Sequence, residues 1–321
     1  MSDGRLARTT DRSVAIDMVR LLGLVVVVAG HVWADRPIGG YVAVFFVLSG
    51  YLWSDKRLPA DDFKHRVRIL IIPYFAWLAL VGGAFLAVEA LRGRAVGELV
   101  DLTVRLLWGG EKIYTPLTAF WFLTAIFAAV TIYRQLRRLP TGLFLLGVAA
   151  CVTATLVGPQ LANLPLALGT GAACVSFIAA GHWFRWLEPR LTHPLITGLA
   201  LAALGAALVI TGVSQRMDLK YGYFGTPIIS VVVACALSCA ALLIAKRLAP
   251  HMPNRAGGVL THIVRMSTPI ILLQTVPIWL LPDSTPLWIL FLTGFALPLA
   301  LGSLLLRYPN SRAREILMPG K

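Results

Sequence analysis

The chain has 321 residues, of which 58% are hydrophobic and only 14% are charged. A soluble globular chain carries roughly a quarter charged residues, so the composition excludes an ordinary soluble protein. The net charge of +14 does not indicate a nucleic-acid partner, because basic residues also orient membrane helices against anionic lipid.

Apolar segments long enough to cross a hydrocarbon core of ~30 Å recur along the whole sequence. They predict an all-α integral membrane protein with about ten transmembrane helices. Connections between the segments are short, the longest being the 92–115 loop, so we expect one polytopic domain over 1–321 and no appended soluble domain. The predicted spans lie near 16–34, 39–54, 69–91, 116–133, 141–158, 164–184, 194–213, 224–245, 263–281 and 286–306.

The distribution of basic residues predicts the orientation of these spans. With the N-terminus inside, the inner segments carry about 20 Lys and Arg residues and the outer loops about 7. Both termini are therefore expected in the cytoplasm, with the protein in the cell (plasma or inner) membrane. A signal peptide ending at residues 32–34 is the rival interpretation, and the acidic Asp17 beside its apolar core argues against it.

The first span, 16–34, carries ionisable residues in one helical phase. Eleven residues separate Arg20 from His31, which at ~100° per residue is within ~20° of three full turns. Asp17 lies one turn before Arg20, and Asp35 one turn after His31. Such a stripe should face a protein interior or a wet cavity. The alternatives are an Arg20 that snorkels to the interface and a His31 that bonds a neighbouring helix.

The second span places small residues among aromatic ones in "YVAVFFVLSGYLWS". Gly50 permits close backbone approach and Ser49 can form a hydrogen bond, flanked by Phe46 and Tyr51. Helix packing by small residues is the alternative interpretation of the same pair. The four cysteines fall within predicted spans and indicate neither a disulfide framework nor a metal site.

A basic cluster precedes the third span, in "DDFKHRVRILIIPYFAW". Arg66 and Arg68 either mark the cytoplasmic face or hold a polyanionic ligand there. Pro73 interrupts the helix that follows.

Together these segments resemble the membrane-bound acyltransferase-3 family, which O-acylates sugars and other envelope molecules. The resemblance is carried mainly by 17–127, and the form of its later motifs is similar to the branch of fucose-type sugar O-acetylases and the enterobacterial common antigen acetyltransferase. The matching motifs, in order, are Arg20-x10-His31, "FFVLSGY" at 45–51, "RVRILIIPY" at 66–74 and "FWFLTAIF" at 120–127.

The resemblance implies transfer of an acyl group, acetyl being the usual one, from cytoplasmic acyl-CoA to a hydroxyl of a carbohydrate or glycolipid acceptor. Arg20, Arg66 and Arg68 would bind the donor's phosphates. His31, roughly 16 Å farther along its helix, would act as general base or carry the acyl group itself, with Asp35 or Asp17 orienting the ring. Residues expected to line the donor channel are Phe46, Ser49, Gly50, Tyr51 and Trp121.

The second half departs from the family's pattern at one position. Members often carry a Tyr-x-x-His in a late span, and here Ile271 and Gln274 occupy those places in "STPIILLQ". The role of that histidine would be dispensable or shifted to the Gln274 amide. A glycan or lipid-linked transporter or flippase is the alternative function, although no internal repeat typical of transporters is visible. A noncatalytic membrane partner is a third. The sequence predicts no oligomeric state.

Overall fold

The structure is a computed structural model that describes residues 3–33, 42–308 and 311–319. In this part of the chain every element is helical apart from an isolated bridge between Asp218 and Tyr223. The first nine α-helices are α1 (Asp3–Val32), α2 (Ala43–Tyr51), α3 (Pro59–Arg66), α4 (Ile72–Trp77), α5 (Gly83–Leu91), α6 (Val96–Trp108), α7 (Trp121–Leu136), α8 (Thr141–Ala154) and α9 (Gly158–Ala162). The others are α10 (Leu168–Ala173), α11 (Val175–Leu187), α12 (Pro194–Ile210), α13 (Ile229–Leu248), α14 (Asn254–Arg265), α15 (Ser267–Leu273), α16 (Val276–Leu280), α17 (Leu287–Arg307) and α18 (Arg312–Leu317).

Several of these helices are long and apolar enough to cross a membrane, which makes the chain a multi-pass membrane protein. Five described helical segments meet that condition alone, or up to seven if each of two bent pairs is one span. The five are Val14–Val32, Ala60–Leu91, Thr141–Ala162, Ile229–His251 and Leu287–Arg307. The pairs are Pro165–Ala173 with Val175–Arg190, bent by 45°, and Asn254–Arg265 with Ser267–Leu280, bent by 53°. Shorter apolar helices are Trp121–Leu136 and Pro194–Ile210.

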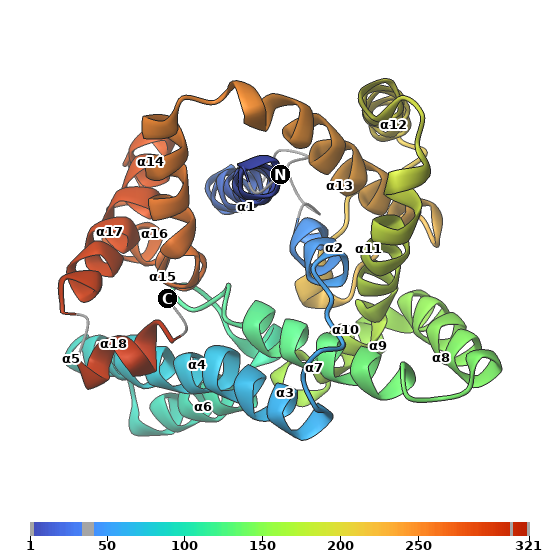
Figure 1. Cartoon of the computed structure of the whole chain (residues 1–321). Helices are drawn as coiled ribbons and strands as arrows, with labels where there is room; N and C mark the ends of the chain where they lie inside the picture. Colours follow the sequence, from blue (N-terminus) through green and yellow to red (C-terminus); the bar gives the residue numbers. More distant parts are fainter. Residues whose placement is uncertain (1–2, 34–41, 309–310, 320–321) are drawn as a thin grey trace.

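Helix α1 lies inside a ring formed by other helices (Figure 1). It contacts α2 from the N-terminal part of the chain and α13, α14, α15 and α17 from the C-terminal part. Helix α1 therefore has protein on several sides, so polar side chains on it can face protein instead of lipid.

Two glycines allow α2 and α11 to approach each other closely. A Cβ added to Gly50 would lie 1.9 Å from the carbonyl oxygen of Ile178, and one added to Gly181 would lie 1.9 Å from that of Val47. Only glycine fits at either position, because any side chain would overlap backbone. Helix packing by small residues, the alternative interpretation of Ser49 and Gly50 in the second span, therefore explains the glycine at position 50.

The third membrane segment is one long helical run with two wide turns. It passes from α3 to α5 through π-helical turns at Val67–Ile71 and Leu78–Gly82. Pro73, close behind the first of these, has no N–H to donate, so the hydrogen-bond ladder must be rearranged around it. The run begins earlier than the predicted span at 69–91, since Ala60–Leu91 is continuous.

The predicted loop at 92–115 is largely helical, and the loop assignment was wrong for its centre. Helix α6 occupies this segment, and along it Asp101 accepts a hydrogen bond of 2.6 Å from Arg105 one turn later. The sequence marked this segment only as the longest connection between spans, and the spacing of four between Asp101 and Arg105 places both on one helix face.

Candidate functional site

His31 lies at the C-terminal end of α1, within electrostatic range of Lys220. We use the name histidine end for His31, Lys220, the Lys220 partners Ile113 and Thr118, and Gln274, whose neighbour Thr275 bonds Pro116 in the segment between those partners. His31 is partly buried, and its Nδ1 lies 2.9 Å from the carbonyl oxygen of Val27. Because a carbonyl only accepts, a neutral His31 carries its proton on Nδ1 and presents the lone pair of Nε2. The imidazole is thus held in the form that can accept a proton.

Lys220 is the buried cation of the histidine end. It lies in a short 3-10 helix, Leu219–Tyr221, and is 6% exposed. Its Nζ donates to the carbonyl oxygen of Ile113, to Thr118 Oγ1 at 2.9 Å and to the Tyr221 hydroxyl at 3.3 Å. These partners from the described chain are all uncharged, so the ammonium is held by neutral oxygens.

Burial lowers the pKa of Lys220 to about 8, against the opposing attraction of Asp218 and Glu111. His31 in turn lies within electrostatic range of both Lys220 and Asp218. A residue that titrates near neutral pH therefore stands close to the imidazole.

The loop that carries Lys220 is fixed by its own backbone. Asp218 and Tyr223 exchange two backbone hydrogen bonds of 2.8 and 2.9 Å. Between them Gly222 has a φ of +69°, and a Cβ there would lie 2.0 Å from the carbonyl oxygen of Gly158. The tight turn against α9 thus requires glycine, and it positions Lys220 two residues earlier.

Gln274 lies at the break between α15 and α16, on the segment that packs against α1. Its side chain is 1% exposed and its Nε2 donates to the carbonyl oxygen of Ile271 at 3.1 Å. Its Oε1 is buried and has no hydrogen-bond partner among the described residues. The next residue, Thr275, donates to the carbonyl oxygen of Pro116 at 2.7 Å, which joins this break to the Ile113–Thr118 segment. A buried acceptor without a partner is costly unless a ligand or water satisfies it.

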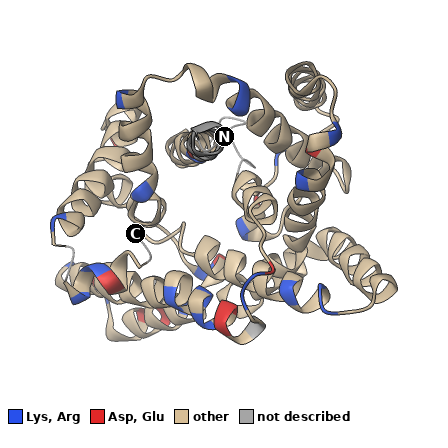
Figure 2. Ribbon diagram, viewed as in Figure 1, with Lys and Arg blue, Asp and Glu red and all other residues tan. Residues whose placement is uncertain are grey.

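A second polar cluster, which we call the arginine end, lies where α2, α3 and α7 terminate; its residues are Trp53, Asp55, Asp62, Arg66 and Arg134. Asp62 accepts hydrogen bonds from Arg66 at 2.6 Å and from Arg134 at 3.2 Å. Arg134 is also 3.4 Å from Asp55, and its guanidinium lies 4.6 Å from the centre of the Trp53 ring. Figure 2 shows acidic and basic segments together around α3. Here each buried charge has an opposite charge beside it.

Asp17, at the inner end of the stripe predicted on α1, is hydrogen-bonded to α14. Asp17 is 6% exposed, accepts a hydrogen bond from Thr261 at 3.0 Å, and lies 3.7 Å from Arg20. The Arg20 side chain is 40% exposed. Asp17 is therefore far along the helix from His31, roughly 20 Å by the rise of fourteen residues. Asp35 lies outside the described residues.

The other residues predicted to bind the donor differ in their exposure to solvent. Arg66 is part of the arginine end and Arg68 is exposed. Phe46 is fully buried against Phe122 and Phe177, and Trp121 is 6% exposed at the start of α7.

The remaining two bond to protein atoms. Ser49 donates to the carbonyl oxygen of Phe45 at 2.8 Å. The Tyr51 hydroxyl donates to Glu188 at 2.7 Å and accepts from Lys246 at 2.6 Å. The Ser49 bond lies within α2, whereas the Tyr51 bonds join α2 to α13 and to the 3-10 turn Glu188–Arg190 that follows α11.

Sequence reasoning missed Lys220 and Arg134. Lys220 counted only as one outer-loop charge, and Arg134 only as one inner charge. A weak signal exists for Lys220, since three aromatic residues follow it closely in "DLKYGYF". Nothing in the sequence predicts the hydrogen bonds of Lys220 to Ile113 and Thr118, which lie more than a hundred positions earlier in the chain. Within the described residues no group of three His, Cys, Asp or Glu side chains is arranged to bind a metal.

Comparison with known proteins gives one family match. The model of an acyltransferase domain, that of the acyltransferase-3 family, matches residues 13–308. No curated protein and no solved structure matches the chain.

Proposed function

The chain belongs to the acyltransferase-3 family, and on that premise we propose that it moves an acyl group, acetyl in the first instance, from cytoplasmic acyl-CoA to a hydroxyl of an envelope glycan, glycolipid or secreted metabolite. The observation that carries the proposal is His31, whose Nε2 is left as a base near the C-terminal end of α1, on the helix that also carries Arg20 eleven residues earlier. The family match favours acyl transfer over a transporter or flippase.

The proposed topology has ten spans with both termini in the cytoplasm, in the cell (inner or plasma) membrane. The five long helices, two bent pairs and two shorter apolar helices each correspond to a predicted span. The remaining span corresponds to α2 together with residues outside the described part. In this topology the arginine end faces the cytoplasm and the histidine end faces the outer leaflet.

The donor's phosphates would bind at the cytoplasmic side. Arg20 and Arg68 expose their guanidinium groups, and Arg66 is fixed on Asp62 by a short ion pair. Cations of this kind bind phosphate strongly, arginine through paired N–H groups. From there the thin pantetheine arm would follow α1 over roughly 16 Å to His31.

At the histidine end the transfer would proceed by general base catalysis. The acceptor oxygen attacks the thioester carbonyl carbon, and His31 Nε2 takes the hydroxyl proton. The carbon–sulfur bond then breaks, and the coenzyme A thiolate leaves and recovers that proton from the imidazolium. A two-step route, with the acyl group held briefly on His31, uses the same geometry.

Lys220 and Gln274 complete the proposed site. The positive charge of Lys220, within electrostatic range of His31, favours the negative charge that develops on the carbonyl oxygen. The buried Oε1 of Gln274 is an acceptor for the hydroxyl of the acceptor substrate. In this proposal the amide takes the place of the histidine that other members carry there.

The test is transfer of label from acyl-CoA to envelope material by the native protein and by His31→Ala. We expect a loss of 10²–10⁴-fold, the usual contribution of a general base. The matched control is His262→Ala, because His262 is exposed and its ring nitrogen lies 3.1 Å from the hydroxyl of Ser303 on α17. Undiminished transfer in the His31 variant would rule out the catalytic assignment.

Donor binding has a separate test. Replacing Arg20 and Arg68 with glutamine should raise the KM for acyl-CoA and leave the thermal unfolding temperature near that of the native protein, since Arg68 is exposed and the Arg20 side chain is 40% exposed. An unchanged KM would contradict donor binding at this end.

A further inference from the structure

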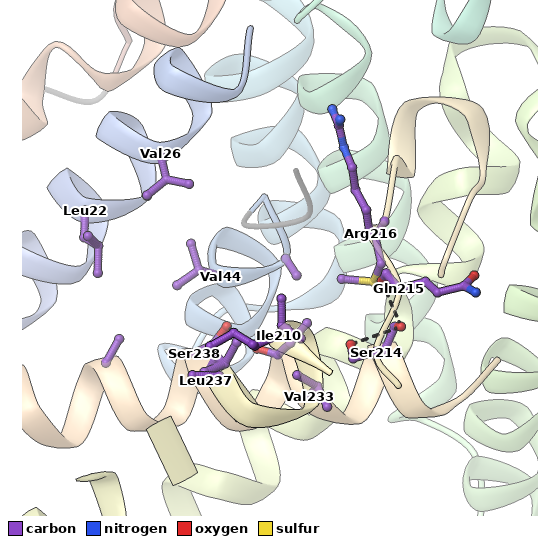
Figure 3. A pocket seen from close by; sticks show the side chains of 18 of the residues that line it. Leu22, Val26, Val44, Ile210, Ser214, Gln215, Arg216, Val233, Leu237 and Ser238 are labelled. Atoms are coloured by element: carbon purple, nitrogen blue, oxygen red, sulfur yellow. Dashed lines mark hydrogen bonds between the residues drawn. The ribbon is translucent and has the colours of Figure 1, made fainter. Parts of the chain in front are cut away.

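An apolar cavity of about 570 Å³ lies between α1, α2, α12 and α13. Figure 3 shows Leu22 and Val26 of α1 facing Val233 and Leu237 of α13 across it. Its volume is within the ~300–1,000 Å³ of sites that bind small molecules. Neither His31 nor Arg20 lines it, so it is distinct from the proposed catalytic stripe.

The cavity runs along the membrane-spanning part of α13. Its lining begins at Ser230 and ends at Ala241 on that helix. Eleven residues of α-helix rise about 16 Å, close to half of a hydrocarbon core of ~30 Å. The depth of the cavity therefore matches one leaflet of a bilayer.

The walls are apolar surfaces that the protein itself leaves uncovered. Leu22 is 52% exposed although α1 lies within the ring of helices (Figure 1), and Ile210 at the end of α12 is 84% exposed. In a bilayer such surfaces are covered by hydrocarbon, because lipid chains are the surrounding solvent.

One end of the cavity is polar. Ser214 Oγ lies 3.2 Å from Ser230 Oγ, which also donates to the carbonyl oxygen of Gln215 at 3.0 Å. Arg216 brings a positive charge to this end, and Figure 3 shows its side chain extending away from the apolar floor on α13. The combination of an apolar channel and a cationic mouth complements a lipid with an anionic headgroup.

The polar end adjoins the histidine end along the chain. Met217 lines the cavity, and the next residues include Asp218 and Lys220, both within electrostatic range of His31. The polar end of the cavity is therefore continuous along the chain with the loop that holds Lys220.

We propose that this cavity binds one hydrocarbon chain of a membrane-anchored acceptor whose headgroup is anionic and carries the hydroxyl to be acylated. This rests on the proposed acyl transfer and narrows its acceptor to lipid-linked molecules. The hydroxyl oxygen forms the new ester bond, the thioester carbon–sulfur bond breaks, and the proton passes through His31 to the coenzyme A thiolate.

The test uses nanodiscs with phosphatidylglycerol that bears a photoreactive group in one acyl chain, and a phosphatidylcholine with the same chain. We expect light to label Leu22, Val26, Val233 and Leu237, with phosphatidylglycerol labelling more strongly. Ala206→Trp fills the cavity and should lower this labelling several-fold. Ala203→Trp is the matched control, since Ala203 is exposed on the same helix but outside the lining. Equal labelling in both variants would overturn the proposal.

Two further arms establish whose hydrocarbon chain is bound and whether its binding depends on catalysis. If palmitoyl-CoA removes the label and acetyl-CoA does not, the chain in the cavity belongs to the donor and the proposal is overturned. The experiment is repeated in His31→Ala, where binding should persist. Labelling that follows the expected pattern in a protein without any acyl transfer supports the lipid site and refutes the proposed enzymatic function alone.

Discussion

The arginine end and the histidine end each hold a buried cation, but the two cations are partnered differently. Arg134 lies within 3.4 Å of two carboxylates, Asp55 and Asp62, and over the ring of Trp53. Lys220 is held by a carbonyl and two hydroxyl oxygens. In a low-dielectric interior, a charge that is paired with an opposite charge has a structural role. A charge without such a partner exerts its electric field on neighbouring groups.

This difference separates a structural role from a catalytic one. Removing a partner at the arginine end should cost stability, because it leaves a charge without compensation. Removing the cation at the histidine end should cost activity instead, because its charge is directed at the reaction. Measurements on variants of the two ends can show whether the roles divide in this way.

The largest effect is expected from Asp62→Asn, which removes the carboxylate shared by Arg66 and Arg134. Its side chain is only 7% exposed, so we expect a loss of roughly 3–5 kcal/mol of unfolding free energy. Thermal unfolding in detergent measures it. Asp55→Asn is the control: Asp55 is 57% exposed, and the loss there should stay within about 1 kcal/mol. Equal shifts in the two variants would contradict the role assigned to Asp62.

Next is Lys220→Met, which keeps the length of the side chain and removes its charge. Acyl transfer should fall about 10²–10³-fold through kcat, as when one group that stabilises an oxyanion is lost. The unfolding temperature should hold or rise, since a buried cation is replaced by an apolar isostere. Lys112→Met is the control, because Lys112 is ion-paired to Glu111 and half exposed. A native kcat in Lys220→Met, or an equal loss in the control, would remove Lys220 from the mechanism.

A smaller effect is expected from Gly50→Ala in the α2–α11 contact. Its Cβ would lie 1.9 Å from the Ile178 carbonyl oxygen, and the displacement should cost about 1–3 kcal/mol of stability. Gly97→Ala in α6 is the matched control, since nothing lies within 4 Å of its added Cβ; it should stabilise by about 0.5–1 kcal/mol. If Gly50→Ala does not lower the unfolding free energy, the close approach of α2 and α11 does not stabilise the fold.

The smallest effect concerns pH. Lys220 has a pKa of about 8 when buried and 10.5 when free. Between these values the unfolded chain binds more protons than the folded one, so unfolding free energy rises as pH rises from about 8 to 10.5. Lys220→Met should lose this contribution, giving a flatter curve than the native protein. Superimposable stability curves over that range would show that Lys220 is not buried as described.

The helical phase of α1 could be predicted from the sequence because it depends only on spacing along one helix. Arg20 and His31 share a face by arithmetic, and the structure keeps both on the one continuous helix. The class of the protein followed in the same way, since hydropathy is a sum over local residues. Family membership followed from motifs whose residues are close in the chain.

The loop at 92–115 shows where local reasoning failed. It was predicted only as a connection between spans, whereas the structure forms the helix α6 there, with Asp101 and Arg105 one turn apart on one face. The second span shows another limit: the motif around Gly50 is compatible with a channel and with close packing, and only the position of Ile178 shows that packing operates there.

The order of the amino acids was sufficient to predict an all-helical membrane protein of the acyltransferase-3 type, with a histidine and an arginine on one face of its first span. Those properties are local, because hydropathy and helical phase are set by neighbours in the chain. The partners of Lys220, Asp62 and Gln274 and the apolar cavity beside Leu22 emerge only in the folded molecule. Their energies depend on groups that folding brings together from distant parts of the chain. In the low-dielectric interior, electrostatic interactions between such groups are stronger than in water.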